Sequence, residues 1–206
     1  MSTLLHIDSS PLEGSITREL TREYVNAWKQ TNPDGAVIRR DLYRETPKSL
    51  DQEWINASYT PADARTPEQH RALEFSDRLI AELEQADEVV IGVAMHNFMI
   101  PSVLKLWIDH VVRAGRTFKY GSNGPQPLLT GKKATIIEAS GGVYEPGTPA
   151  AAMNFIEPYL RTILGFIGIT DVRFVRAAGV ARLHSGAVQR ETFLRPALDQ
   201  LRAALA

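Results

Sequence analysis

Residues 88–101 read EVVIGVAMHNFMIP, an apolar run followed by His, Asn and further large apolar residues. Such an unbroken run is typical of a strand buried on both faces, as in a parallel sheet. Pro101 predicts the first turn of a helix, because its fixed φ suits that position. The strand therefore leads almost directly into a helix, and Met95, Phe98 and Met99 in the connection are most simply core residues.

Four more short apolar runs alternate with segments of helical periodicity. The five expected strands are Leu4–Ile7, Val37–Ile38, Val89–Val93, Thr135–Ile137 and Val172–Val175. The expected helices are Ile16–Gln30, Pro67–Gln85, Pro101–Ala114, Ala150–Leu164 and Val188–Leu205. This alternation predicts an α/β fold, a flavodoxin-like doubly wound five-stranded parallel sheet of order 2-1-3-4-5 with helices on both faces.

Two long polar stretches, Leu42–Thr66 and Thr117–Gly131, are expected to be irregular and functional or mobile. In the second, Asn123-Gly124 is a two-residue turn signal, which predicts a short hairpin or flap. Phe118 is expected in the core. Tyr120 has two readings: it covers a planar substrate, or it closes the edge of the core.

The composition restricts the class of protein. The chain has 206 residues, of which 44% are hydrophobic, so we expect one domain over residues 1–206. Lys and Arg number 23 and Asp and Glu 24, a net charge of -1 that argues against a nucleic-acid partner. No cysteine, signal peptide or membrane-length run is present, and no His pair has metal-ligand spacing. We therefore expect a soluble cytoplasmic protein without a metal site or a membrane partner.

In a sheet of this kind, ligands bind beyond the carboxyl ends of the strands. After strand 1, hydroxyl side chains precede a helix start, at Ser9, Ser10, Ser15 and Thr17. Free N–H groups and the helix dipole make this a candidate phosphate site, but Ser15 is equally well a simple N-cap. Arg18 favours the phosphate slightly, because a cation in the first turn opposes the dipole unless an anion is present.

After strand 4, the segment EASGGVY places Gly141 and Gly142 directly behind a buried strand. Turn chemistry explains most such pairs, but two glycines also let the backbone approach a flat ligand closely. Exposed N–H groups at Gly141 and Gly142 would then face the electronegative atoms of a ring.

Taken together, these three loops resemble those of a known protein family. The segments SSPLEGSIT, MHNFMIPSVLKLWIDHVVRAGRTFKYGSNGPQPLLTGKKA, SGG and YLRTILGFIGITDVRFVRAAGV resemble the FMN-dependent NADH-azoreductase and NADH:quinone oxidoreductase family over nearly the whole chain. The resemblance implies FMN as cofactor, with its phosphate at Ser10 and at Ser15, Ile16 and Thr17. It implies that the isoalloxazine ring lies along Met95, His96, Asn97 and Phe98, and that its pyrimidine end meets Ala139, Ser140, Gly141 and Gly142.

Two departures from the family are visible. The family commonly has Tyr at the position of His96, and often Ser-Arg-Gly-Gly where this chain has Ala139-Ser140-Gly141-Gly142. The first alters the substrate pocket, in which His96 and Tyr120 are candidates. The second removes a cation that stabilises reduced flavin. His96 either donates to a substrate oxygen or points to solvent, in which case only its backbone matters.

The resemblance implies a ping-pong reaction, in which NADH or NADPH reduces the flavin and a quinone or azo acceptor then takes two electrons. The cofactor carries the chemistry, so no catalytic dyad is required. The resemblance also implies a homodimer, and the strongly apolar helix from Val103 to Val112 suits either a core or a subunit contact. The main alternative is a flavodoxin-type electron carrier, although such carriers are usually strongly acidic.

Overall fold

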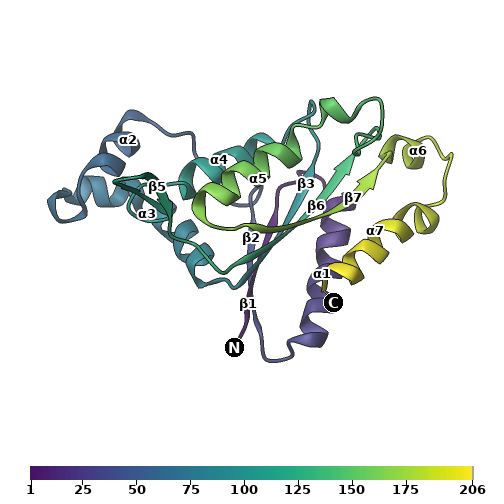
Figure 1. Cartoon of the computed structure of the whole chain (residues 1–206), viewed down its shortest axis with the longest axis horizontal. Coiled ribbons are helices and arrows are strands. Elements are labelled where there is room, and N and C mark those ends of the chain that lie inside the picture. Colours follow the sequence, from purple (N-terminus) through teal and green to yellow (C-terminus); the bar gives the residue numbers. More distant parts are fainter. Residues whose placement is uncertain (206) are drawn as a thin grey trace.

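The computed structural model describes residues 1–205 and contains a five-stranded parallel sheet (Figure 1). Its strands are β1 (Thr3–Asp8), β2 (Ala36–Asp41), β3 (Glu88–Ala94), β6 (Lys133–Ser140) and β7 (Asp171–Ala178). Their spatial order is β2-β1-β3-β6-β7. Since β6 and β7 are the fourth and fifth strands of this sheet along the chain, the predicted order 2-1-3-4-5 is confirmed.

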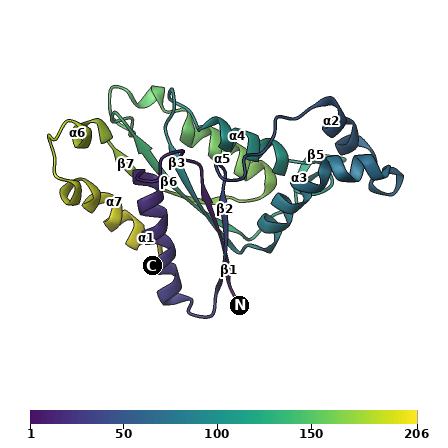
Figure 2. The same ribbon diagram turned by 180° about the vertical axis from the view of Figure 1, so that it is seen from behind.

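Helices cover both faces of the sheet, as Figure 2 shows from behind. One face carries α1 (Ile16–Thr31) and α7 (Arg190–Leu205), and the other carries α3 (Pro67–Gln85), α4 (Ser102–Val111) and α5 (Ile156–Ile167). Each layer buries a separate apolar core, centred on Trp28 for α1 and on Trp107 for α4. Across residues 1–205, no helix has the length and apolarity needed to cross a membrane.

Burial on both faces, expected for the run that forms β3, is found in the three central strands only. Strands β1, β3 and β6 are almost wholly buried, whereas β2 and β7 keep exposed or half-buried side chains. The edge strands have a neighbour on one side only, and the helices cover them less completely.

Helix α3 has the expected bounds. It begins at Pro67 because Thr66 and Gln69 form a reciprocal capping box at this end. The stretch Leu42–Thr66 was expected to be irregular, which is wrong in part. It contains α2 (Gln52–Tyr59) and the short 3₁₀ helix η1 (Ala62–Ala64). Asp51 caps α2, which buries only Trp54 and Ala57, so its helical period was too weak to recognise.

The expected helix Ala150–Leu164 is interrupted. A 3₁₀ turn, η2 (Ala151–Met153), comes first, and α5 starts only at Ile156, where the side chain of Asn154 accepts from the Ile156 N–H at 2.9 Å. The expected hairpin is present as β4 (Phe118–Gly121) and β5 (Gly124–Pro127). Gly121 pairs with Gly124, so the two turn residues are Ser122 and Asn123, one position earlier than the turn signal.

Candidate active site

A cavity of about 320 Å³ opens at the carboxyl ends of the central strands. All three loops named from the sequence line it, through Ser10, Ser15, Ile16, Met95, His96, Ala139, Ser140 and Gly141. The other predicted residues lie beside it. Thr17 is buried beneath Ser15, Asn97 and Phe98 form the tip of the neighbouring turn, and Gly142 lies against Tyr144.

The first loop presents free donors at the start of α1. Ser15 is the N-cap and accepts from the N–H of Arg18, and its hydroxyl lies 2.8 Å from that of Thr17. Within residues 1–205, the N–H groups of Ile16 and Thr17 have no hydrogen-bond acceptor. Gly14 lines the cavity, and a Cβ added to it would meet nothing within 4 Å. The capping role of Ser15 and an anion site at the helix start are therefore compatible.

Arg18 does not support the phosphate site in the way its position suggested. Its guanidinium donates to Asp41 at 2.8 and 2.9 Å and to the carbonyl of Ser10 at 2.7 Å, and it lies 3.4 Å from Asp8. Burial alone would raise the pKa of Asp8, but His6 and Arg18 together hold that pKa below its ordinary value. The anion that Arg18 needs is thus supplied by the protein's own carboxylates, and its role is to hold the loop in place.

The second loop folds into a tight turn. His96 and Met99 exchange backbone hydrogen bonds of 2.9 and 3.0 Å, and the two residues between them have positive φ, 49° at Asn97 and 67° at Phe98. Both values belong to the left-handed region, as in a type I′ turn. Asn tolerates this region, whereas Phe adopts it at a cost.

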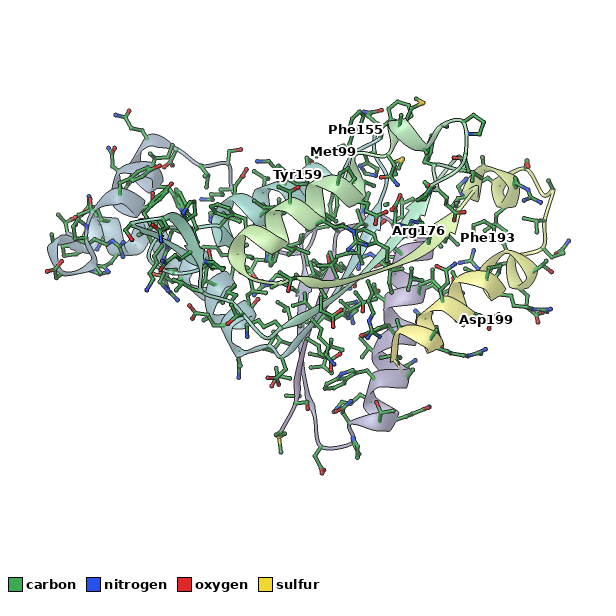
Figure 3. The ribbon with its side chains drawn as sticks, viewed as in Figure 1. Met99, Phe155, Tyr159, Arg176, Phe193 and Asp199 are labelled. Carbon is green, nitrogen blue, oxygen red and sulfur yellow. The ribbon has the colours of Figure 1, made fainter. Side chains whose placement is uncertain are left out.

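The turn separates its apolar side chains. Met95 and Met99 pack against the core between the sheet and α4 and α5, as expected. Phe98 is instead 36% exposed, and its ring lies edge-on to Tyr144 at 5.8 Å. Figure 3 shows Met99 and Phe155 at this end of the sheet, where Phe155 donates its N–H to the Phe98 carbonyl at 3.1 Å.

The third loop offers backbone donors as well. Gly179 donates to the carbonyls of Ser140 and Gly142, and Ala181 donates to that of Gly141. The N–H groups of Gly141 and Gly142 have no acceptor within the described residues. A Cβ on Gly142 would come within 2.8 Å of the Tyr144 hydroxyl, but one on Gly141 would meet nothing within 4 Å. A side chain at Gly142 would therefore have to displace the Tyr144 ring, whereas Gly141 leaves open space in the cavity.

A fourth wall was missed by the sequence interpretation. It is formed by the short helix α6 (Val180–His184) and the first residue of α7, and it contributes Val180, Ala181, His184 and Arg190. The carboxyl end of β7 belongs to the same edge of the sheet, so the rule that selected the other loops applied to this one too.

Tyr120 lies elsewhere. It is 73% exposed and lines a separate cavity of about 450 Å³ between the hairpin, α2, α4 and α5. Within one chain, the structure does not bring Tyr120 and His96 into the same cavity.

Comparisons with known proteins agree with this geometry. Residues 2–205 match the family model described as "Flavodoxin-like fold". The chain is 57% identical to the FMN-dependent NADH:quinone oxidoreductase of Acidobacterium capsulatum, with 98% of each chain covered. It is 45% identical to FMN-dependent NADH:quinone oxidoreductase 3 of Burkholderia lata, with 100% of each covered.

Solved structures give the same result. An azoreductase from Bacillus anthracis superposes with a TM-score of 0.87 at 28% identity, covering 100% of this chain and 99% of that one. An FMN-dependent NADH-azoreductase from the same species, in complex with FMN, also has a TM-score of 0.87, at 25% identity and with 100% and 98% covered. The chain belongs to the flavodoxin-like family of FMN-dependent NADH:quinone oxidoreductases and azoreductases.

Proposed function

We propose that this chain is an FMN-dependent oxidoreductase that uses NADH to reduce quinones and azo compounds. One observation carries the proposal: a cavity at the carboxyl edge of the sheet combines free backbone donors with space left by Gly14 and Gly141. The same cavity has an anion-binding helix start at one end. These features suit a planar ring that carries a phosphate.

Each loop has a part in holding FMN. The N–H groups of Ile16 and Thr17, with the hydroxyls of Ser10 and Ser15, bind the phosphate. The N–H groups of Gly141 and Gly142 meet the polar edge of the ring, and the turn at Asn97 lies along it. When bound, FMN supplies two-electron chemistry, accepting a hydride from NADH and passing two electrons to the acceptor.

We infer a ping-pong order, in which NADH and the acceptor use the same open site in turn. The loops that end β1, β3 and β6 line the cavity and would hold the ring from one side, which would leave its other side to both reactants. His96 is exposed at this rim, where its imidazole can donate to an acceptor oxygen. The chain's residues therefore bind and orient the reactants, and none acts as a nucleophile.

The proposal includes a homodimer. Ile55, Tyr59 and Tyr120 expose apolar surface around the 450 Å³ cavity, with side chains 43%, 80% and 73% exposed. An exposed apolar group of this kind is typical of an interaction surface. In a dimer this surface would meet a partner, and Tyr120 would approach the partner's cofactor rather than its own. If sedimentation finds only monomers and these retain full turnover, this part of the proposal is contradicted.

The visible spectrum of the purified protein tests the central claim. Flavin bands should be present or appear after FMN is added, and anaerobic NADH should bleach them. Addition of a quinone should restore the bands and yield hydroquinone. A protein that binds FMN and accumulates semiquinone without oxidising NADH would instead be an electron carrier, and a protein without any flavin band would overturn the proposal.

A further inference from the structure

The wall formed by α6 and α7 places Arg190 beside the start of α1. Arg190 is the first residue of α7, and α7 packs against α1 on the same face of the sheet. Its guanidinium forms an ion pair with Glu19, in the first turn of α1, while the side chain stays 48% exposed. Both Arg190 and Ser15, the N-cap of α1, line the 320 Å³ cavity.

The lining of the cavity contains no acidic side chain. Its ionisable lining residues are His96, His184 and Arg190, and no Asp or Glu lines it. The whole chain has 23 Lys and Arg against 24 Asp and Glu, so the lack of acidic side chains is a local property of this cavity. Two carboxylates are close by: Glu19 is paired with Arg190, and Glu13 lies between the lining residues Leu12 and Gly14 without lining the cavity itself. The cavity therefore favours an anion.

The helix start alone provides only part of what a phosphate dianion requires. Its N–H groups and dipole amount to about half an elementary charge. Arg18, the cation within the first turn of α1, is occupied by Asp41 and Asp8 and by the carbonyl of Ser10. Arg190 is the arginine that lines the cavity, and a guanidinium pairs well with phosphate oxygens.

We propose that Arg190 is a specificity-determining residue that makes the site select FMN, a flavin phosphate, over riboflavin, which lacks the phosphate. This inference rests on the proposed use of FMN. Glu19 holds the guanidinium at the first turn of α1, where the phosphate would compete with this carboxylate for it. His184, at the end of α6, adds a second donor on the same wall.

Flavin titrations test this role without reference to activity. The purified full-length chain, freed of flavin, is titrated with FMN and with riboflavin while flavin fluorescence is followed. Arg190→Ala should weaken FMN binding about tenfold, the scale of one lost charged hydrogen bond, and leave riboflavin binding unchanged. High salt should reduce the difference between the wild type and the variant. Arg195→Ala, on the same helix but 68% exposed and outside the cavity, is the matched control and should bind both flavins normally.

A second variant keeps the inference testable if Arg190→Ala does not fold. Glu19→Gln removes the carboxylate that competes for Arg190, so it should tighten FMN binding and leave riboflavin binding unchanged. Equal changes for both flavins, or no change in FMN affinity, in the folded variants would overturn the role of Arg190 while FMN binding itself stands. Failure of the wild type to bind either flavin would overturn the proposed function as well.

Discussion

At the scale of single residues, the turn at Asn97 and Phe98 stands out. A two-residue turn with positive φ at both positions favours Asn-Gly, because glycine has no Cβ to clash. This chain has Phe98 instead, at φ 67°. Its ring is half exposed beside Tyr144 rather than buried in the core. Its backbone conformation and its exposure motivate the hypothesis that the ring serves the candidate active site beside it.

Two replacements of Phe98 distinguish the backbone strain at this position from a role of its ring in binding the acceptor. Phe98→Gly relieves the left-handed backbone and should leave the free energy of unfolding unchanged or raise it, whereas Phe98→Ala keeps the strain. The two variants should therefore differ by about 1 kcal/mol in urea unfolding, with the Gly variant more stable. Both should raise the KM for the acceptor several-fold. Equal stabilities would show that the backbone at Phe98 is not strained.

The two neighbouring glycines are expected to behave differently. Gly141→Ala places a methyl group in the cavity, so it should weaken FMN binding about tenfold and change stability by less than about 0.5 kcal/mol. Gly142→Ala is the matched comparison, because its Cβ would press against the ring of Tyr144 and displace it. It should lower the melting temperature more than Gly141→Ala does. Flavin titration and thermal unfolding of both variants check this contrast.

At the scale of elements, a buried carboxyl anchors the start of α5. Glu138 on β6 is 3% exposed, and it accepts from the Asn154 amide at 3.1 Å. The Asn154 side chain in turn accepts from the N–H of Ile156, the first residue of α5, and Phe155 between them donates to the Phe98 carbonyl. This chain of contacts links the middle of the sheet to the turn beside the cavity. Arg176, which is labelled in Figure 3, is the register partner of Glu138 on β7 and pairs with Glu157 in the first turn of α5.

The pH dependence of stability should report on Glu138. Burial raises the pKa of Glu138 above its ordinary value, although Arg176 and Asn154 oppose the shift. The folded state therefore holds this proton more tightly than the unfolded state, and stability falls as pH rises from the ordinary Glu value through the raised one. Glu138→Gln keeps an acceptor for Asn154 and removes the titration. Its free energy of unfolding should exceed that of the wild type at neutral pH and converge with it in acid, and a constant difference across pH would contradict this assignment.

At the scale of the whole molecule, two groups of exposed apolar side chains stand out. One surrounds the 450 Å³ cavity at α2 and the hairpin, and the other consists of Phe98, Val143, Met153 and Phe155, in the segments that follow those lining the 320 Å³ cavity. In a two-fold dimer the surface of one copy can cover the active site of the other. In the proposed dimer, the partner would complete the exposed rim of the candidate FMN cavity.

Ile55 offers a direct test of this arrangement. Ile55→Glu puts a charge on the apolar surface at α2, where Ile55 is 43% exposed. It should weaken the free energy of dimerisation by about 2 kcal/mol or more, which sedimentation would detect as a shift towards the monomer. Turnover should fall with the dimer. Tyr43→Glu changes a similarly exposed residue, 38% exposed, outside both cavities and is the control. A dimeric Ile55→Glu variant with normal turnover would move the interface elsewhere.

The sequence by itself determined the order of strands in the sheet and the edge at which the site lies. Apolar runs such as Val89–Val93 report burial locally, and parallel alternation leaves few topologies open. Three of the four loops around the cavity followed from this edge, together with Ser10, Ser15, His96 and Gly141. Helix α2 was not predicted, because eight residues with two buried side chains carry little periodic signal.

Only the tertiary structure decided which charges meet. Arg18 is next to the proposed phosphate site in sequence, yet it is bound to Asp41 on β2, whereas Arg190 reaches the same cavity from far along the chain. It also revealed that Asn97 and Phe98 adopt positive φ. Ion pairing and backbone strain depend on groups brought together by packing, and no local pattern encodes those partners. The fold could therefore be predicted from periodicity, whereas the electrostatics of the site depends on contacts between residues distant in sequence.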